Sequence, residues 1–263
     1  MKPATLGFVL PGLSAEFRIA KTEAALLPLF ALTGTTVGSF LWGWLADVYV
    51  RRVSIHLSTI LFVSTAICGA MPAFVWNLGM CFLMGIFAGG MLPVIYTLLA
   101  EVMPPRHRSW VLVLVGGKGL VGGYLAASGA AHMLEPVYGW RSLWLQGFPS
   151  GLLLLALARF IPETPRFLAE RGRLAELARM QKRFGLAPKP RPQSAPPDAL
   201  VAADHRRITG ALVTTALCWS FVNFGLLLWL PSDLQARGYS AEVASGIHAK
   251  SSLLALPTIL LAA

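Results

Sequence analysis

The chain consists of apolar runs of about 20 residues, each separated from the next by a short polar segment. The complete runs cover residues 24–46, 53–74, 76–102, 110–133, 140–161 and 208–230. A helix needs about 20 apolar residues to cross the hydrocarbon core of a bilayer. We therefore predict six complete spans in an all-α integral membrane protein, the last span ending at Pro231. Gly34 and Gly38 lie four residues apart in the first run, which predicts close packing against another helix.

Two further apolar runs lie near the ends of the sequence. Residues 1–13 hold an apolar piece that ends at Pro11 and Gly12, before a polar turn at 14–23. A helix of this length rises about 20 Å, which is less than the hydrocarbon thickness of about 30 Å. Another apolar run covers 241–263. We expect a truncated first helix and part of a last one.

Charged residues are few and unevenly placed. They make up 13% of the chain, against about 25% in a typical soluble domain. Of the 22 Lys and Arg residues, 14 fall at 51–52, 106–108 and 166–207, and four fall in the loops of the opposite side. Loops rich in Lys and Arg lie on the cytoplasmic side of membrane proteins. This topology accounts for the net charge of +10, so no nucleic-acid partner is expected.

Three of these basic loops carry motifs. Residues 43–52 read Gly-Trp-Leu-Ala-Asp-Val-Tyr-Val-Arg-Arg. They resemble the Gly-x-Leu-Ala-Asp-Arg-x-Gly-Arg-Arg loop between the second and third helices of major facilitator superfamily transporters. Two positions depart from this pattern, because Val48 replaces the usual basic residue and Val50 replaces the usual glycine. Residues 101–109 resemble the Glu-x-x-Pro-x-x-x-Arg-Gly loop after helix four of the sugar-porter-like branch. Residues 162–166 resemble the Pro-Glu-Ser-Pro-Arg motif that ends helix six in the same branch.

This resemblance covers the whole chain and implies the major facilitator fold. Residues 1–161 then form the N-terminal six-helix bundle with a truncated helix one. Residues 162–207 form a cytosolic loop, with an amphipathic helix at 166–185 and a proline-rich linker at 187–199. Residues 208–263 form helix seven and part of helix eight of the C-terminal bundle. The implied location is the inner (plasma) membrane, with multiple crossings.

The resemblance also implies a function. It is secondary active transport of a small polar or anionic metabolite (a sugar, an organic acid or an aromatic acid) by alternating access, coupled to protons. The implied partners are the lipid bilayer, the substrate and protons, and we expect no enzymatic chemistry, no cofactor and no metal. The alternative is a non-transporting remnant or gene fragment of such a transporter. Because alternating access needs two bundles, the 263-residue chain alone is expected not to transport.

The loop motifs supply a candidate cytoplasmic gate. Its members are Asp47, Arg51, Arg52, Glu101, Arg108, Glu163 and Arg166. In the family, the aspartate is expected to meet the positive N-terminus of a helix in the other bundle, a pairing that contributes up to about 2 kcal/mol. Each exposed ion pair contributes about 0–1 kcal/mol, so the gate would depend on a network. Interface anchoring and solvated helix caps explain the same residues and remain the alternative.

Polar and aromatic side chains within the spans are the candidate substrate-binding residues. They are Lys118, Tyr96, Gln146, Trp219, Asn223 and Lys250, and Trp42 is a further candidate for the pathway. Lys118 lies about 14 Å along its helix from the cytoplasmic end, where a charge costs about 3 kcal/mol. We expect it to face the interior of the bundle and to favour anionic substrates. Lysine snorkelling and ordinary packing are the alternatives for this set.

Overall fold

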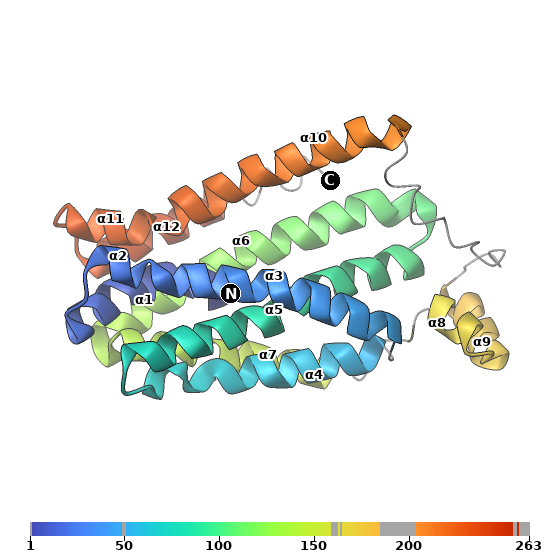
Figure 1. Ribbon diagram of the computed structural model, residues 1–263, viewed down its shortest axis with the longest axis horizontal. Coiled ribbons are helices and arrows are strands. Elements are labelled where there is room, and N and C mark those ends of the chain that lie inside the picture. The colour runs from blue at the N-terminus through green and yellow to red at the C-terminus, as the bar shows by residue number, and fades with distance from the viewer. Residues whose placement is uncertain are drawn as a thin grey trace.

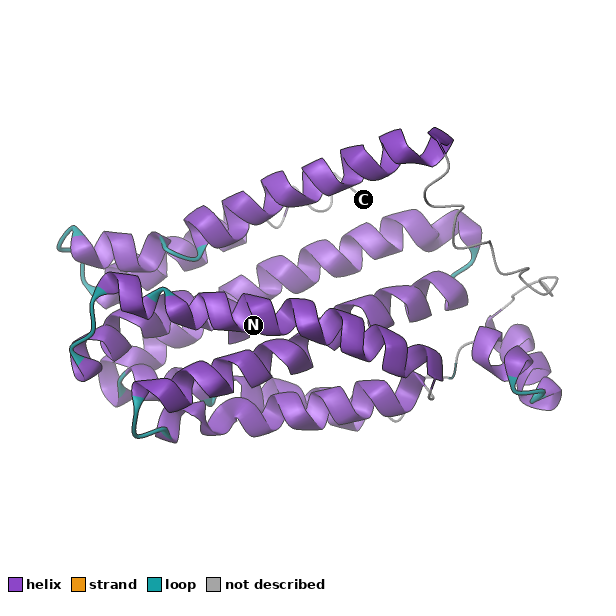
Figure 2. Ribbon diagram, viewed as in Figure 1, coloured by secondary structure: helices purple, strands orange, loops and turns teal. Residues whose placement is uncertain are grey.

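The computed structural model describes residues 2–48, 51–158, 163, 165–184, 203–254 and 257. Within these residues the secondary structure is helical and contains no strand (Figure 2). The helices, in chain order, are α1 (Lys2–Phe17), α2 (Lys21–Ala24), α3 (Leu26–Val48), α4 (Arg51–Ser64), η1 (Thr65–Ala70), α5 (Phe74–Val102), α6 (Pro105–Tyr138), η2 (Trp140–Trp144), α7 (Gly147–Ala158), α8 (Pro165–Glu170), α9 (Leu174–Phe184), α10 (Ala203–Ser220), η4 (Phe221–Leu227), α11 (Leu230–Ala236) and α12 (Ala241–Leu254). The long helices run roughly along one common direction, with α2 and α11 at one end of the molecule and α8 and α9 at the other (Figure 1).

Five stretches of the described chain are long and apolar enough to cross a bilayer, as judged by length and composition. They are Lys21–Leu45, Val53–Ala70, Phe74–Val102, Arg106–Tyr138 and Arg206–Ala236. These stretches correspond to five of the six predicted spans. The remaining predicted span, 140–161, consists of the 3₁₀ helix η2 followed by α7, and its residues 159–161 lie outside the described residues.

Glycines hold α3 and α5 in very close contact. A Cβ on Gly38 would lie 2.7 Å from the carbonyl carbon of Ile86, and one on Gly85 would lie 2.8 Å from the nitrogen of Thr35. Real Cβ atoms essentially never approach so closely, so a larger residue would push the two backbones apart. The close packing predicted from the glycine spacing is therefore confirmed. Trp42 is buried in this interface and donates from Nε1 to the Ile86 carbonyl at 3.0 Å, which favours a packing role for it.

The first helix is longer than the apolar piece at 1–13 predicted for it, and it includes the first residues of the turn predicted at 14–23. The helix α1 continues through Pro11 and Gly12 to Phe17. Proline has no N–H, so Pro11 leaves the carbonyl of Gly7 without its helical donor. The hydroxyl of Ser232, in α11, donates to this carbonyl at 3.3 Å. A proline is tolerated here because a distant part of the chain supplies the missing hydrogen bond.

The prediction that the 208–230 span ends at Pro231 is wrong. The α-helix α10 gives way to a π-helical stretch, η4, and the chain then continues into α11, which ends at Ala236. Pro231 lies in the first turn of α11, where a residue without N–H is well tolerated. Pro231 is thus the second residue of a new helical segment, which begins at Leu230.

Residues 165–184 form two short helices in place of the single amphipathic helix predicted at 166–185. A turn at Gly172, with φ of 70°, separates α8 from α9. Leu168 of α8 and Met180 of α9 pack against Val102 at the end of α5. This apolar cluster attaches the pair to the end of the bundle. The predicted proline-rich linker at 187–199 lies outside the described residues.

Candidate functional site

Two helices far apart in the sequence, α6 and α12, pack against each other along one seam. The ring of His132, in α6, lies with Nδ1 3.1 Å from the carbonyl oxygen of Glu242, in α12. A carbonyl oxygen only accepts, so in this contact Nδ1 carries the proton. Gly246 faces the same ring, because a Cβ there would lie 3.7 Å from Nδ1. The seam joins the helices that precede α8 and α9 in the chain to those that follow them.

A buried histidine lies deeper in this seam. His248 of α12 is only 5% exposed. Its ring meets Phe8 of α1 edge-on, with centroids 5.6 Å apart, and lies tilted against Tyr124 of α6 at 5.3 Å. Phe8 is itself buried. The imidazole therefore connects three helices from both parts of the chain.

The parts of the chain before and after α8 and α9 make a second contact, which joins α1 to residues 228–232. Gly7 lies against Leu228, so that a Cβ at position 7 would overlap the carbonyl oxygen of Leu228. The hydrogen bond from Ser232 to the Gly7 carbonyl lies beside this contact. Both contacts use backbone atoms of α1, which allows no side chain between the two segments.

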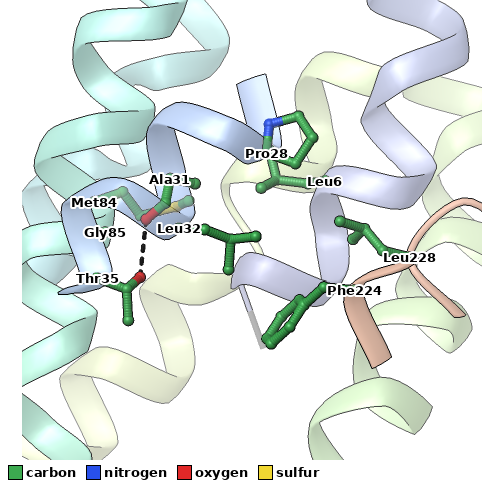
Figure 3. A pocket seen from close by; sticks show the side chains of 9 residues that line it. All are labelled: Leu6, Pro28, Ala31, Leu32, Thr35, Met84, Gly85, Phe224 and Leu228. Carbon is green, nitrogen blue, oxygen red and sulfur yellow. Dashed lines mark hydrogen bonds between the residues drawn. The ribbon is translucent and has the colours of Figure 1, made fainter. Parts of the chain in front are cut away.

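A small apolar pocket opens between α1, α3, α5 and η4 (Figure 3). It is lined by Leu6, Pro28, Ala31, Leu32, Thr35, Met84, Gly85, Phe224 and Leu228. The hydroxyl of Thr35 donates to the carbonyl of Ala31 at 2.9 Å, within its own helix (Figure 3). Its polar group is thus already satisfied. The pocket offers apolar walls but no charged side chain among its lining residues.

Two of the predicted substrate-binding residues connect helices. The hydroxyl of Tyr96, in α5, packs against Gly116 of α6, where a Cβ would overlap it. Gln146, between η2 and α7, donates from Nε2 to the hydroxyl of the buried Thr5 in α1. Its Oε1 atom is buried and has no hydrogen-bond partner among the described residues. This oxygen is free to accept a hydrogen bond from a substrate. The substrate-binding role of Gln146 stays a prediction.

Two others lie at the π-helical stretch. Asn223 is buried in η4 and donates from Nδ2 to the Trp219 carbonyl at 3.0 Å. Trp219 is half exposed, with its ring edge-on to Phe224. Phe224 in turn lines the apolar pocket. Short π-helical insertions occur often at functional sites, so this stretch keeps its place among the candidates.

The side chains of both lysines are exposed in this chain. Lys118 is nine residues, or about two and a half turns, from Ala127, which is fully buried. It therefore lies on the face of α6 opposite the packed one. Lys250 follows His248 by two residues, a rotation of about 200°, and lies opposite the buried face of α12. The structure does not bring either lysine into the seam, and their role toward an anionic substrate stays a prediction.

The predicted gate residues lie at the end of the bundle near α8 and α9. Glu101 lies in the last turn of α5, and Arg108, in the first turns of α6, donates to the Met103 carbonyl at 3.4 Å. Glu163 precedes α8. The side chains of Asp47, Arg51, Arg52 and Arg166 lie outside those that the structure describes. The network among these residues therefore stays a prediction.

The opposite end of the bundle carries an ion pair that the sequence-based prediction missed. Arg141 of η2 contacts Glu16 of α1 at 2.5 Å and donates to the Gly69 carbonyl at the same distance. Trp140 also donates to Glu16, from Nε1 at 3.0 Å. The hydrogen bond from Arg141 holds the pKa of the Glu16 carboxyl below its usual value. The cluster fastens the end of α1 to η1 and η2.

His248 was also missed, although a signal was present. An ionisable residue inside an apolar span indicates a functional site, and His248 lies within the last apolar run. The fold and the seam together define a multi-pass membrane protein in which two helical units meet around buried polar and aromatic side chains. This is the arrangement expected of a carrier.

Comparison with known proteins identifies the family. The sequence profile of the Major Facilitator Superfamily matches residues 4–263. The niacin transporter NiaP of Acinetobacter baylyi is 27% identical over 250 residues, which cover 89% of this chain and 56% of NiaP. The 4-hydroxybenzoate transporter PcaK of the same organism is 28% identical over 265 residues, which cover 92% of this chain and 56% of PcaK.

The fold is similar to solved structures of the same class. A partially occluded, inward-open structure of the xylose transporter XylE from E. coli matches with a TM-score of 0.66 at 18% identity, covering 95% of this chain and 68% of that one. The chain belongs to the Major Facilitator Superfamily. Its relatives are transporters rather than enzymes, and it is a multi-pass protein of the inner (plasma) membrane. The chain spans about half the length of the curated relatives that it matches.

Proposed function

We propose that this chain is part of a secondary transporter that moves a small aromatic carboxylic acid across the membrane by alternating access, together with protons. The relatives NiaP and PcaK are named for niacin and 4-hydroxybenzoate. Both compounds are planar aromatic rings that carry a carboxyl group. The similarity to XylE concerns the fold alone, so the proposal favours aromatic acids over sugars.

The observation that carries the proposal is the seam between the two helical units. Alternating access requires two units that close against each other on one side of a central site. Here α1 and α6 meet α11 and α12 through backbone contacts at Gly7 and through the hydrogen bond from His132 to the Glu242 carbonyl. Binding sites combine apolar walls with a few polar groups. Phe8, Tyr124 and His248 supply such a combination within the seam.

Uptake by reconstituted vesicles tests the proposal. The intact protein, expressed from its own gene, is placed in sealed vesicles with an inward proton gradient, and radiolabelled nicotinate or 4-hydroxybenzoate is added outside. We expect saturable uptake of at least one acid, collapse of that uptake by a protonophore, and no competition by xylose. Uptake no greater than in protein-free vesicles for both acids would contradict the proposal.

A further inference from the structure

His248 is a buried titratable group whose ring serves as a contact point for three helices. Its neighbours are Phe8 of α1 and Tyr124 of α6, and its own helix is α12. By helix rise it lies about 10 Å beyond the start of α12 at Ala241. A movement of α12 relative to α1 and α6 therefore changes the surroundings of this ring. Residues so placed can respond to the conformational state of the whole protein.

The buried polar side chains of α12 differ in whether their hydrogen-bonding atoms are paired. Among the described residues, the buried Nδ1 atom of His248 has no hydrogen-bond partner. The buried serines of the same helix behave differently, because Ser245 donates to the Ala241 carbonyl at 2.8 Å and Ser252 to the His248 carbonyl at 2.9 Å. Buried polar atoms are nearly always paired. An unpaired ring nitrogen in a carrier is thus a site at which a proton or a substrate group can bind.

Within the part of the chain that the structure describes, the titratable groups around the ring offer a protonated His248 no anionic partner. Tyr124 is the titratable residue that faces it from α6, and Phe8 faces it from α1. On α12, Glu242 lies six residues earlier, about 9 Å along the axis, and Lys250 lies on the opposite face. On α6, Glu135 lies eleven residues beyond Tyr124, about 16 Å away along that helix. An unpaired buried charge is costly, so a proton on the ring favours either an open seam or a bound anion.

We propose that His248 is the proton-binding residue that couples proton movement to substrate movement, an inference that rests on the proposed transport function. The neutral imidazole takes up one proton from the extracellular side when the seam is open. The resulting imidazolium is balanced by the substrate carboxylate, which allows the seam to close. On the cytoplasmic side the carboxylate and the proton both leave, and the ring returns to its neutral form. One proton thus accompanies one monocarboxylate.

The test separates coupling from transport as such. The intact protein and its His248→Gln variant are reconstituted, and two rates are measured with labelled nicotinate or 4-hydroxybenzoate: accumulation driven by a proton gradient, and exchange across a membrane with equal pH on both sides. Glutamine keeps an N–H donor for a carboxylate but binds no proton. We expect accumulation to fall at least tenfold, exchange to stay within about threefold of the wild type, and the variant's uptake to lose its pH dependence. His107→Gln is the matched control, because His107 is exposed at the cytoplasmic end of α6 and pairs with Trp110.

The outcomes are distinct. Gradient-driven accumulation by His248→Gln at the wild-type level would overturn the coupling role. Loss of exchange together with accumulation would also overturn it, because His248 would then be required for the carrier cycle or the fold in general. If the wild-type protein itself neither accumulates nor exchanges either acid, the proposed function fails, and this inference fails with it.

Discussion

Replacing Gly85 by alanine adds one methyl group to the interface of α3 and α5, where the structure leaves no space for it. The new Cβ would lie 2.8 Å from the Thr35 nitrogen and 3.0 Å from the Ala31 carbonyl carbon, whereas ordinary contact begins at 3.4 Å. The nearest atom is the Ala31 carbonyl oxygen, which the new Cβ would overlap, so the backbones must separate locally by more than 0.6 Å, the difference between 3.4 and 2.8 Å. All three obstructing atoms belong to the backbone, so no side-chain rotation relieves the overlap. Overpacking of this kind costs about 1–3 kcal/mol.

Gly79→Ala is the matched control, because it lies in the same helix and a Cβ there would meet nothing within 4 Å. Both substitutions gain the helix propensity of alanine, about 0.8–1 kcal/mol. We therefore expect Gly79→Ala to be neutral or stabilising and Gly85→Ala to be less stable than it by about 1–3 kcal/mol. Each kcal/mol shifts Tm by about 2–4 °C in a domain of this size. Thermal unfolding of the intact protein in detergent, followed by tryptophan fluorescence, measures the difference; equal Tm values for the two variants would refute the close-packing argument.

The remaining predictions concern topology and the ion pair at the end of α1. The topology is tested by cysteine labelling in a background that lacks the exposed Cys218. A cysteine at Ser240 should react with an impermeant external maleimide in whole cells, and one at Arg179 should react only after the membrane is opened. The reverse pattern would invert the assignment of sides. Glu16→Gln should lower the stability of the intact protein by about 0.2–1 kcal/mol at neutral pH, since the pair with Arg141 is partly exposed. Because pairing lowers the pKa of Glu16 in the folded protein, this stabilisation is complete above the ordinary glutamate pKa and is lost as the pH falls through the lowered value. The Tm difference between variant and wild type should therefore shrink in acid, and a difference that grows in acid would contradict the assignment.

The helical architecture followed from hydropathy, and the errors arose where distant contacts override local rules. Proline usually ends or kinks a helix, yet Pro11 lies within α1 because Ser232 donates to the carbonyl that it leaves unpaired. Pro231 lies in the first turn of α11 rather than at the end of a span. The break at Gly172 divides a segment whose amphipathic pattern suggested one helix. Each of these features depends on a tertiary contact or a backbone torsion that a hydropathy pattern does not contain.

The site was less predictable than the fold. A charged residue in an apolar span marks a candidate functional residue, but the sequence does not say which face of the bundle its side chain points to. Lys118 and Lys250 were selected for their depth, and the helical phase places each on the face of its helix opposite a buried residue. His248 lies two residues from Lys250, and its significance comes from Phe8 and Tyr124, which lie 240 and 124 residues away in the sequence. No local pattern brings these three rings together. The structure was needed to separate a buried ring from an exposed ammonium group on the same helix.

The most direct test of the account is the movement of protons with substrate. The intact protein is reconstituted into vesicles that contain a pH-sensitive dye, with no initial gradient, and nicotinate or 4-hydroxybenzoate is added outside while uptake is measured in parallel. Protein-free vesicles correct for acid that crosses the lipid unaided. The account predicts saturable acidification of the lumen, with about one proton for each molecule of acid taken up. Saturable uptake with no change in internal pH beyond the protein-free control, or no protein-dependent uptake of either acid, would contradict it.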